Sequence, residues 1–260
     1  MHNKIDSTNI KNFLINDLDN IDIYTFDSID STNTYLKNIS SNIKNEFTTV
    51  VANEQTQGRG RLGRQFFSPA NTGIYMSFII KPDMSITDAT FITTATSVAV
   101  CKAIENVTHL NPKIKWINDI YIENKKACGI LAEAITDINS GNLAGIIIGI
   151  GINVNTTNDI FPENIKDIAT ALTISNKIDR NELIASILNE FHIIYNNPQD
   201  YMEDYKKRSL ILNKDIYYIQ NGIKYYGTAI DFTENGGLVI IDNEGNKKTL
   251  TSGEISVRLN

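Results

Sequence analysis

Residues 55–64 read QTQGRGRLGR, a segment with three glycines and three arginines that separates two apolar stretches. The stretch before it, residues 47–52, and the stretch after it, residues 74–80, are rich in β-branched and aromatic residues, and each predicts a strand. The polar segment between these strands is long for a simple connection and contains turn-forming residues. It therefore predicts a loop with a function of its own, placed between two strands of a sheet.

The residue types of this loop favour an anionic ligand. Glycine lets the backbone approach a ligand closely, and the planar guanidinium group of arginine suits carboxylates and phosphates. A solvated basic loop is an equally good interpretation of the segment taken alone. The spacing does not match a Walker phosphate loop, and Gly58, Gly60 and Gly63 do not open a helix as a dinucleotide-binding motif requires. The length and glycine content also predict a loop that is mobile when empty and closes over its ligand.

The sequence before this loop predicts a strand followed by a helix. Residues 21–29 are suited to a strand, and Ser31 or Thr32 can cap a helix that continues through residues 35–39. The strand-to-helix corner then falls on residues 30–33. Residues 1–20 carry apolar side chains at helical spacing, which predicts a short helix in an extension too small for a separate DNA-binding domain.

The sequence after the loop predicts further helices and strands and then a second, smaller domain. A buried helix is expected in residues 86–107, strands in residues 113–116, 121–123, 127–133 and 143–154, and an amphipathic helix in residues 179–196. From residue 215 onward, short strands separated by closely spaced hairpin turns predict a small β-barrel that docks on the larger domain. The expected division is an extension (1–20), a main domain (21–211) and the barrel (212–260).

A second group of polar residues falls within one predicted hairpin. Residues 115–119 read KWIND, and Lys126, Gly129 and Glu133 follow in an otherwise apolar stretch. Trp116 is expected in the core. The ammonium group of Lys126 could meet an anion at the mouth of the sheet or extend into solvent, because the sequence does not show which way the side chain points. Further on, GIGIN (149–153) ends a very apolar strand, where glycines either make room for a flat ligand or mark a bulge.

The composition favours a cytoplasmic globular enzyme. The 260 residues carry a formal net charge of −6, which disfavours non-specific binding to nucleic acid. Cys101 and Cys128 lack metal-ligand or CxxC spacing and are expected to be reduced and buried. Neither a signal peptide nor a stretch long enough to span a bilayer is evident. The three histidines have no serine or cysteine partner that suggests a triad, which disfavours a covalent hydrolase.

In chain order, the motifs DSTN (30–33), QTQGRGRLGR, KWIND with KKACGILAE (125–133), GIGINVN (149–155) and SGEISVR (252–258) closely resemble those of the biotin protein ligases. The resemblance spans residues 21–259. It implies an α+β fold, with a mixed central β-sheet and flanking helices followed by a small C-terminal β-barrel. The implied activity is ATP-dependent activation of biotin to biotinyl-5′-AMP with release of pyrophosphate. Biotin is then transferred to a lysine of a biotin carboxyl carrier protein, as in acetyl-CoA carboxylase.

The resemblance also implies roles for individual residues. Lys126 and Arg61 are the expected catalytic residues, meeting the biotin carboxylate and the α-phosphate. The implied biotin site consists of Ser31, Thr32, Asn33, Gln55, Gly58, Arg59, Gly60, Arg61, Lys126 and Gly129. The implied nucleotide site consists of Arg59, Arg61, Arg64, Asp119, Lys126, Asn153 and Arg258. Magnesium is expected to arrive with the phosphates of ATP, and Asp119 is the candidate protein ligand for it.

The acceptor domain of the carrier protein is the expected partner, with no nucleic acid and no membrane, and both a monomer and a homodimer are compatible with the sequence. Three departures from the family pattern stand out. Ile117 stands where the family usually has proline. Trp116 is the only tryptophan, so that none is left to stack on adenine. The N-terminal helix-turn-helix of bifunctional members is missing, which predicts a ligase without repressor activity.

Three alternatives are disfavoured by specific features. Lipoate-protein ligases and octanoyltransferases share the catalytic fold and a comparable lysine, but they typically have a different glycine-rich loop and lack the SGEISVR ending. A non-catalytic biotin or nucleotide sensor does not require both the arginine loop and Lys126. A nucleic-acid module built on the terminal barrel would use exposed tyrosines such as Tyr225, but acids such as Asp231 and Glu244 lie nearby in the sequence.

Overall fold

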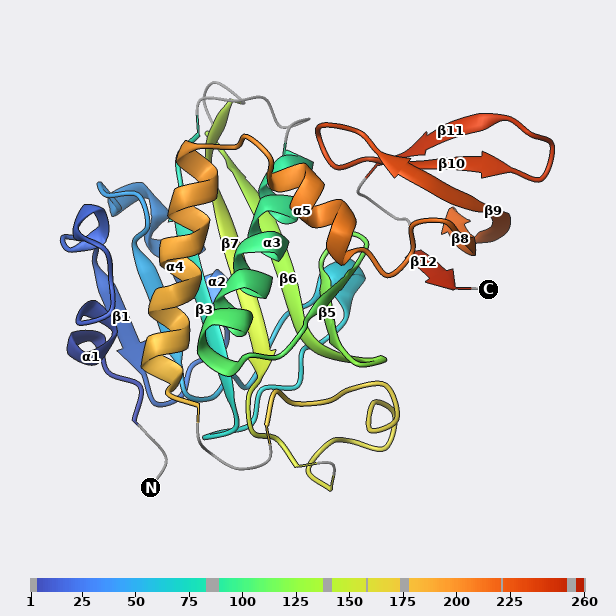
Figure 1. Cartoon of the computed structure of the whole chain (residues 1–260). Coiled ribbons are helices and arrows are strands. Elements are labelled where there is room, and N and C mark those ends of the chain that lie inside the picture. The colour runs from blue at the N-terminus through green and yellow to red at the C-terminus, as the bar shows by residue number, and fades with distance from the viewer. Residues whose placement is uncertain are drawn as a thin grey trace.

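The computed structural model (Figure 1) describes residues 4–82, 89–137, 142–157, 159–173, 178–220, 222–251 and 256–259. Its larger part is a seven-stranded sheet with the order β1-β2-β3-β7-β6-β5-β4. β1 and β2 are parallel, and the other neighbours are antiparallel. The strands are β1 (Ile23–Phe26), β2 (Thr49–Ala52), β3 (Gly73–Ile80), β4 (Lys113–Lys115), β5 (Asp119–Ile122), β6 (Lys125–Thr136) and β7 (Leu143–Asn153). The predicted mixed central sheet is confirmed.

Helices cover both faces of this sheet. On one face, α3 and α4 lie side by side, and α5 packs on α3 (Figure 1). On the other face, α2 packs against β2, β3 and β7. The helices are α1 (Ser7–Lys11), α2 (Thr32–Ile39), α3 (Ala89–Thr108), α4 (Arg180–Asn196) and α5 (Tyr201–Arg208), with short 3-10 turns η1 (Asn16–Leu18), η2 (Ser40–Asn42) and η3 (Arg61–Gly63). Among the described residues, no helix is long and apolar enough to cross a membrane.

The apolar strand β7 illustrates how the sheet is buried on both faces. Successive side chains of a strand point to opposite faces. Ile146, Ile148 and Ile150 therefore join the large core beneath α3 and α4, whereas Ile147 joins the smaller core beneath α2. Gly149 and Gly151 lie on the α2 face. Isoleucine side chains at these two positions would fill the space above the strand and leave none for other groups. The continuous apolar run follows from burial on both sides, and the two glycines mark a gap in the α2 face.

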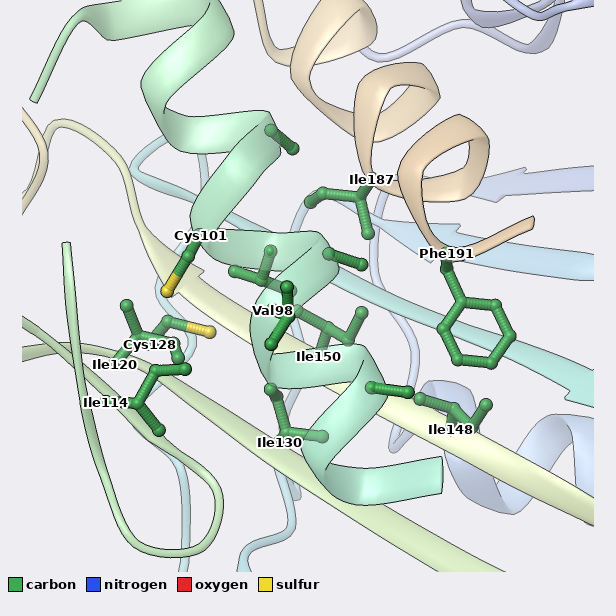
Figure 2. Packing of buried hydrophobic residues seen from close by; sticks show 14 of the residues in the cluster. Val98, Cys101, Ile114, Ile120, Cys128, Ile130, Ile148, Ile150, Ile187 and Phe191 are labelled. Atoms are coloured by element: carbon green, nitrogen blue, oxygen red, sulfur yellow. The ribbon is translucent and has the colours of Figure 1, made fainter. Parts of the chain in front are cut away.

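The predicted burial of the two cysteines is confirmed. Cys101 of α3 and Cys128 of β6 lie next to each other in the core between the helix and the sheet, as Figure 2 shows, and both are free thiols. Burial raises the pKa of each thiol well above its usual range. Since the thiolate is the reactive form, neither cysteine is expected to be reactive in the folded protein.

We predict that a thiol reagent at about pH 8 leaves both cysteines of the native protein unmodified, because few thiolates form and the reagent has no access. After unfolding in denaturant, both thiols should react rapidly. Counting the modified thiols by mass spectrometry checks this expectation. Rapid modification of the native protein would contradict it and would show that the interface between α3 and β6 opens easily.

The C-terminal part forms a second sheet of five antiparallel strands with the order β11-β10-β9-β8-β12. They are β8 (Lys214–Gln220), β9 (Ile223–Phe232), β10 (Leu238–Asp242), β11 (Lys247–Leu250) and β12 (Ser256–Leu259). The expectation of a closed barrel is corrected, because in the described chain β11 and β12 form the two edges and do not pair. Each edge strand has four residues, which is short for the staggered pairing that closes a barrel.

The second sheet contacts the larger part of the chain through the turn between β9 and β10. Trp116 donates its indole N–H to the carbonyl oxygen of Gly236 at 2.9 Å, and the Tyr201 hydroxyl donates to the carbonyl oxygen of Glu234 at 3.1 Å. Lys206 and Asp231 form an ion pair at 2.8 Å beside these contacts. Trp116 is 6% exposed, as expected of a core residue, and it connects the C-terminal sheet to the KWIND segment.

Candidate active site

A cavity of about 150 Å³ lies between the start of α2, strands β5, β6 and β7, and the glycine–arginine loop, which we define as residues 53–72 between β2 and β3. Its lining includes apolar residues such as Phe66, Met76 and Ile150. The charged residues of the lining are five cations and one acid, namely Arg59, Arg61, Arg64, Lys115, Lys126 and Asp119. The excess of positive charge suits an anionic ligand, and the apolar surface suits one that also carries a hydrocarbon or ring portion.

The start of α2 supplies a set of buried polar groups to this cavity. Ser31, one of the two residues predicted for this role, is the N-cap of α2, and its side chain accepts from the backbone N–H of Thr34. Thr32 donates its backbone N–H to Gln55 Oε1 at 2.9 Å, and its hydroxyl lies 3.1 Å from the same oxygen. The hydroxyl groups of Thr32 and Ser77 are 2.6 Å apart. The helix start and the loop are therefore joined by hydrogen bonds that fix Gln55.

A second set of contacts joins the loop to the sheet through Glu133 of β6. Ser77 donates its hydroxyl to Asn33 Oδ1 at 2.5 Å, and Asn33 donates its amide Nδ2 to Glu133 Oε2 at 2.7 Å. The other carboxylate oxygen of Glu133 pairs with the guanidinium group of Arg59 at 3.0 Å. Asn33 and Ser77 are buried, and buried polar groups are costly unless each has a partner. The chain of bonds supplies those partners and defines a polar wall of the cavity.

Lys126 owes its direction to an irregularity in β6. Ile120 of β5 pairs with Cys128, but the next residue, Tyr121, pairs with Lys126, so that Ala127 has no partner of its own in this ladder. Such a β-bulge shifts the alternation of side chains by one residue. Lys126 therefore lies on the same side as Gly129, where an added methyl group would be 3.1 Å from the Lys126 ammonium nitrogen. Without the bulge, Lys126 would share the core-facing side of Cys128.

Asp119 and Lys126 form an ion pair in the cavity. Asp119 is paired with Gly129 in the sheet register, and its Oδ1 lies 2.6 Å from Lys126 Nζ. About a third of each side chain is exposed, at 28% for Asp119 and 34% for Lys126. Both groups can therefore reach a ligand that enters the cavity.

Arg61 approaches the same region from the loop. Its guanidinium group donates to Asn118 Oδ1 at 3.0 Å, and Asn118 in turn donates its amide to the carbonyl oxygen of Ile130 at 2.8 Å. Burial lowers the pKa of Arg61, Asp119 counteracts that effect, and Arg64 adds to it. Arginine stays charged despite such shifts. Arg61 and Lys126 therefore both place positive charge near Asp119.

Most of the predicted site residues line this cavity together. They are Ser31, Thr32, Asn33, Gln55, Arg59, Gly60, Arg61, Arg64, Asp119, Lys126 and Gly129. Gly58 does not line it but lies under the loop, where an added methyl group would be 2.4 Å from the carbonyl oxygen of Phe66. Close packing of the loop thus requires glycine at this position.

Asn153 and Arg258 are placed differently. Asn153 donates its amide to the carbonyl oxygen of Thr170 at 3.1 Å, and Thr170 donates its backbone N–H to the carbonyl oxygen of Lys126 at 2.9 Å. Asn153 therefore supports the segment beside Lys126 and is not part of the described cavity lining. Arg258 falls in β12, but its side chain lies outside the described part of the structure, as do residues 252–255 at the start of the SGEISVR motif. Nucleotide contacts by Asn153 and Arg258 stay predictions.

Ser77 and Phe66 were not singled out from the sequence, and Glu133 was noted in the predicted hairpin without an assigned role. Ser77 is a polar residue inside a strand that is otherwise apolar, and that contrast is the signal by which it could have been found. Phe66 is less obvious, because aromatic residues are common in cores. Its ring covers the backbone of Gly151, where an added methyl group would come within 2.6 Å of the ring. The cis peptide bond between Trp116 and Ile117 lies in the adjoining turn.

The fold thus places a cavity rich in cationic side chains beneath a glycine–arginine loop. Residues 25–153 match the model of the biotin/lipoate A/B protein ligase family. The chain is 37% identical over 232 residues to the bifunctional ligase/repressor BirA of Bacillus spizizenii, covering 85% of this chain and 70% of the relative. The chain belongs to the biotin/lipoate A/B protein ligase family.

Other comparisons fall on the biotin-specific members of that family. The biotin–[acetyl-CoA-carboxylase] ligase of Mycobacterium tuberculosis is 26% identical over 217 residues, covering 79% of this chain and 77% of the relative. The solved structure of a biotin protein ligase from Aquifex aeolicus in complex with biotin and ATP is 30% identical and superposes with a TM-score of 0.77, covering 92% of this chain and 99% of that one.

Proposed function

We propose that this chain is a biotin protein ligase that activates biotin with ATP and transfers it to a lysine of a carrier domain. The observation that carries the proposal is the convergence of Arg61 and Lys126 on one cavity that also contains the hydrogen-bonded polar groups of Thr32 and Gln55. Biotin has a cyclic urea at one end and a carboxylate at the other. A buried urea needs matched donors and acceptors, and the carboxylate must meet an α-phosphate despite their like charges.

The first half-reaction joins the biotin carboxylate to AMP. A carboxylate oxygen attacks the α-phosphorus, a P–O bond to pyrophosphate breaks, and biotinyl-5′-AMP forms. Lys126 and Arg61 are the groups placed to offset the negative charge that builds on the phosphoryl oxygens, and they bring the two anions together. No covalent attachment to the enzyme is required. Arg59 and Arg64 on the same loop are placed to contact the nucleotide phosphates.

Magnesium fits this site as a companion of ATP. Among the described residues, no group of three or more His, Cys, Asp or Glu side chains is placed to hold a metal ion. Asp119 is the acid of the cavity lining, and magnesium is commonly held by one or two carboxylates together with substrate phosphates. When bound with ATP, the ion would supply further positive charge to the phosphates. Asp119 would hold it, and the same carboxylate orients Lys126.

The second half-reaction transfers biotin to the partner. The neutral amine of the acceptor lysine attacks the acyl carbonyl, an amide bond forms, and AMP leaves with the electron pair of the broken C–O bond. The mixed anhydride is already activated, so the enzyme chiefly positions the reactants and excludes water. The partner proposed is a biotin carboxyl carrier domain such as that of acetyl-CoA carboxylase, and the proposed location is the cytoplasm, where reduced cysteines such as Cys101 are normal.

We predict that the purified chain releases pyrophosphate only when both biotin and ATP are present and that it then labels a carrier domain with biotin. Pyrophosphate release and the mass of the carrier domain are the two measurements. Controls omit ATP, replace biotin with lipoate, or use a carrier domain whose acceptor lysine is changed to arginine. Transfer of lipoate in place of biotin would contradict the proposal and would identify a lipoate ligase.

A further inference from the structure

The base of the glycine–arginine loop is crossed by a buried arginine from a distant helix. Arg180 is the first residue of α4, and the residue is 4% exposed. Its guanidinium group donates to Asn53 Oδ1 at 3.0 Å, where the loop begins, and to the carbonyl oxygen of Gly73 at 3.1 Å, where the loop ends. One side chain thus contacts both ends of the loop.

The two ends of the loop are also joined to each other at this point. Asn53 donates its amide to Asn71 Oδ1 at 3.2 Å, and Asn71 donates its backbone N–H to Asn53 Oδ1 at 3.3 Å. Asn71 adopts a left-handed backbone conformation with φ 66°, which asparagine tolerates better than most residues. Because Asn53 Oδ1 accepts from both Arg180 and Asn71, the arginine fixes the amide that holds the two limbs together.

A buried arginine is an expensive way to stabilise a fold. Burial lowers the pKa of Arg180, with Tyr75 and Asp179 counteracting that effect. The two groups at the ends of the loop that accept from Arg180, Asn53 Oδ1 and the carbonyl oxygen of Gly73, are neutral. Removing the guanidinium group would take this donor from both acceptors, which itself costs stability. Beyond stability, Arg180 contributes geometry, because one guanidinium group joins the two ends of the loop.

The hydrogen bonds at the base of the loop continue toward the groups that are proposed to bind biotin. Gln55 lies two residues beyond Asn53, its backbone N–H donates to the carbonyl oxygen of Ser68 on the returning limb at 3.1 Å, and its side chain holds Thr32. Further along, Phe66 donates its backbone N–H to the carbonyl oxygen of Gly58 at 3.0 Å. The relative position of the two limbs at their base therefore sets the position of Gln55 and of the arginines beyond it.

We infer that Arg180 is a positioning residue for biotin binding, which ties the two limbs of the glycine–arginine loop at their base so that Gln55 is in place before the ligand enters. The inference rests on the proposed function. If the hydrogen bonds made by Arg180 are lost, the loop samples other arrangements. Part of the free energy of ligand binding must then be used to order the loop, which weakens the observed affinity. Once the ligand is bound, Lys126 and Arg61 are arranged as before, so the chemical step is little changed.

The test compares Arg180→Met and Asn53→Ala with the native chain in biotin-dependent pyrophosphate release. Arg180→Met is expected to raise KM for biotin at least about tenfold through the lost preorganisation. Its kcat should stay within about threefold of the native value, since no transition-state contact is removed. Arg180→Lys should restore part of the affinity. The double variant Arg180→Met/Asn53→Ala should resemble the worse single variant, because both changes release the same tie.

Arg208→Met is the matched control, because Arg208 is another largely buried arginine and pairs with Glu105 and Asp204, away from the loop. It should lower thermal stability without changing KM for biotin. Trypsin cleavage after Arg59, Arg61 and Arg64 in the ligand-free proteins gives a readout that needs no activity, and Arg180→Met should be cleaved faster there than Arg208→Met. Unchanged KM in Arg180→Met, or equal cleavage in the two variants, would overturn the inference. An inactive native chain would refute only the proposed function, since trypsin cleavage of the loop still tests whether Arg180 holds the two limbs together.

Discussion

Replacing Lys126 with alanine is expected to lower the rate of biotinyl-adenylate formation roughly 100- to 1,000-fold, the usual effect of removing one group that stabilises charge in a transition state. Lys126 is held by Asp119 at 2.6 Å and is turned toward the cavity by the bulge at Ala127. Its loss removes one of the two cations placed to offset the charge on the α-phosphoryl oxygens and takes the Lys126 partner from Asp119 beside the incoming anions. Single-turnover pyrophosphate release with saturating biotin and ATP measures the effect.

Lys125→Ala is the matched control for this prediction. Lys125 is the neighbouring lysine of the same strand, its side chain is directed to the opposite face, and it does not belong to the cavity lining. It should retain nearly the native rate, and both variants should unfold at similar temperatures because Lys126 is partly exposed. A Lys126→Ala enzyme that keeps more than about a tenth of the native rate would show that the positive charge of this residue is not needed in the transition state.

The direction of Lys126 illustrates what the sequence could not supply. Strand alternation assigns Lys126, Cys128 and Ile130 to one face, and two of the three are indeed core residues. The bulge that separates Lys126 from them depends on which residues of β5 lie opposite, and that register is a long-range property. A single sequence gives the residue types of a strand but not the position of an extra residue within its ladder.

The fold was predictable where local signals were strong. The capped helix at Thr32–Ile39, the strands that flank the loop and the amphipathic helix Arg180–Asn196 were all expected near their observed positions. The N-terminal helix is shorter than its apolar spacing suggested, because α1 ends at Lys11 and η1 forms a separate turn. The short helix α5 (Tyr201–Arg208) was not anticipated, since its largely charged sequence is stabilised by Tyr201 and Tyr205 packing on other elements.

The candidate site was predictable as a set of residues but not as a network. Family motifs pointed to Asn33, Gln55 and Arg59, and each of these lines the cavity. The residues that connect them, Ser77 and Glu133, belong to strands that are distant in sequence, and only the folded arrangement shows that they complete the hydrogen bonds. Arg180 is a stronger example, because its partners are more than a hundred residues away.

Adding a single methyl group in Gly149→Ala is expected to weaken biotin binding roughly ten- to a hundredfold, the equivalent of about one lost hydrogen bond to a charged group. The new methyl carbon at this position would lie 2.1 Å from Asn33 Oδ1, so the amide must move. Its bonds to Ser77 and Glu133 are then broken, Arg59 loses a correctly placed partner, and the polar wall that positions Gln55 is disturbed. Titration of biotin without ATP, followed by calorimetry, measures this loss.

The double variant Asn33→Ala/Gly149→Ala separates the steric cause from a general effect on β7. Removing the Asn33 amide opens the space that the new methyl group needs, so the double variant should bind biotin as Asn33→Ala does and should unfold no earlier than Gly149→Ala. The coupling arises because the two residues are in direct contact, where effects of substitutions are not additive. If the losses of biotin affinity in the two single variants simply add in the double variant, Gly149 does not affect the site through its contact with Asn33. The space above Gly149 in the sheet face is then not needed to accommodate the Asn33 side chain.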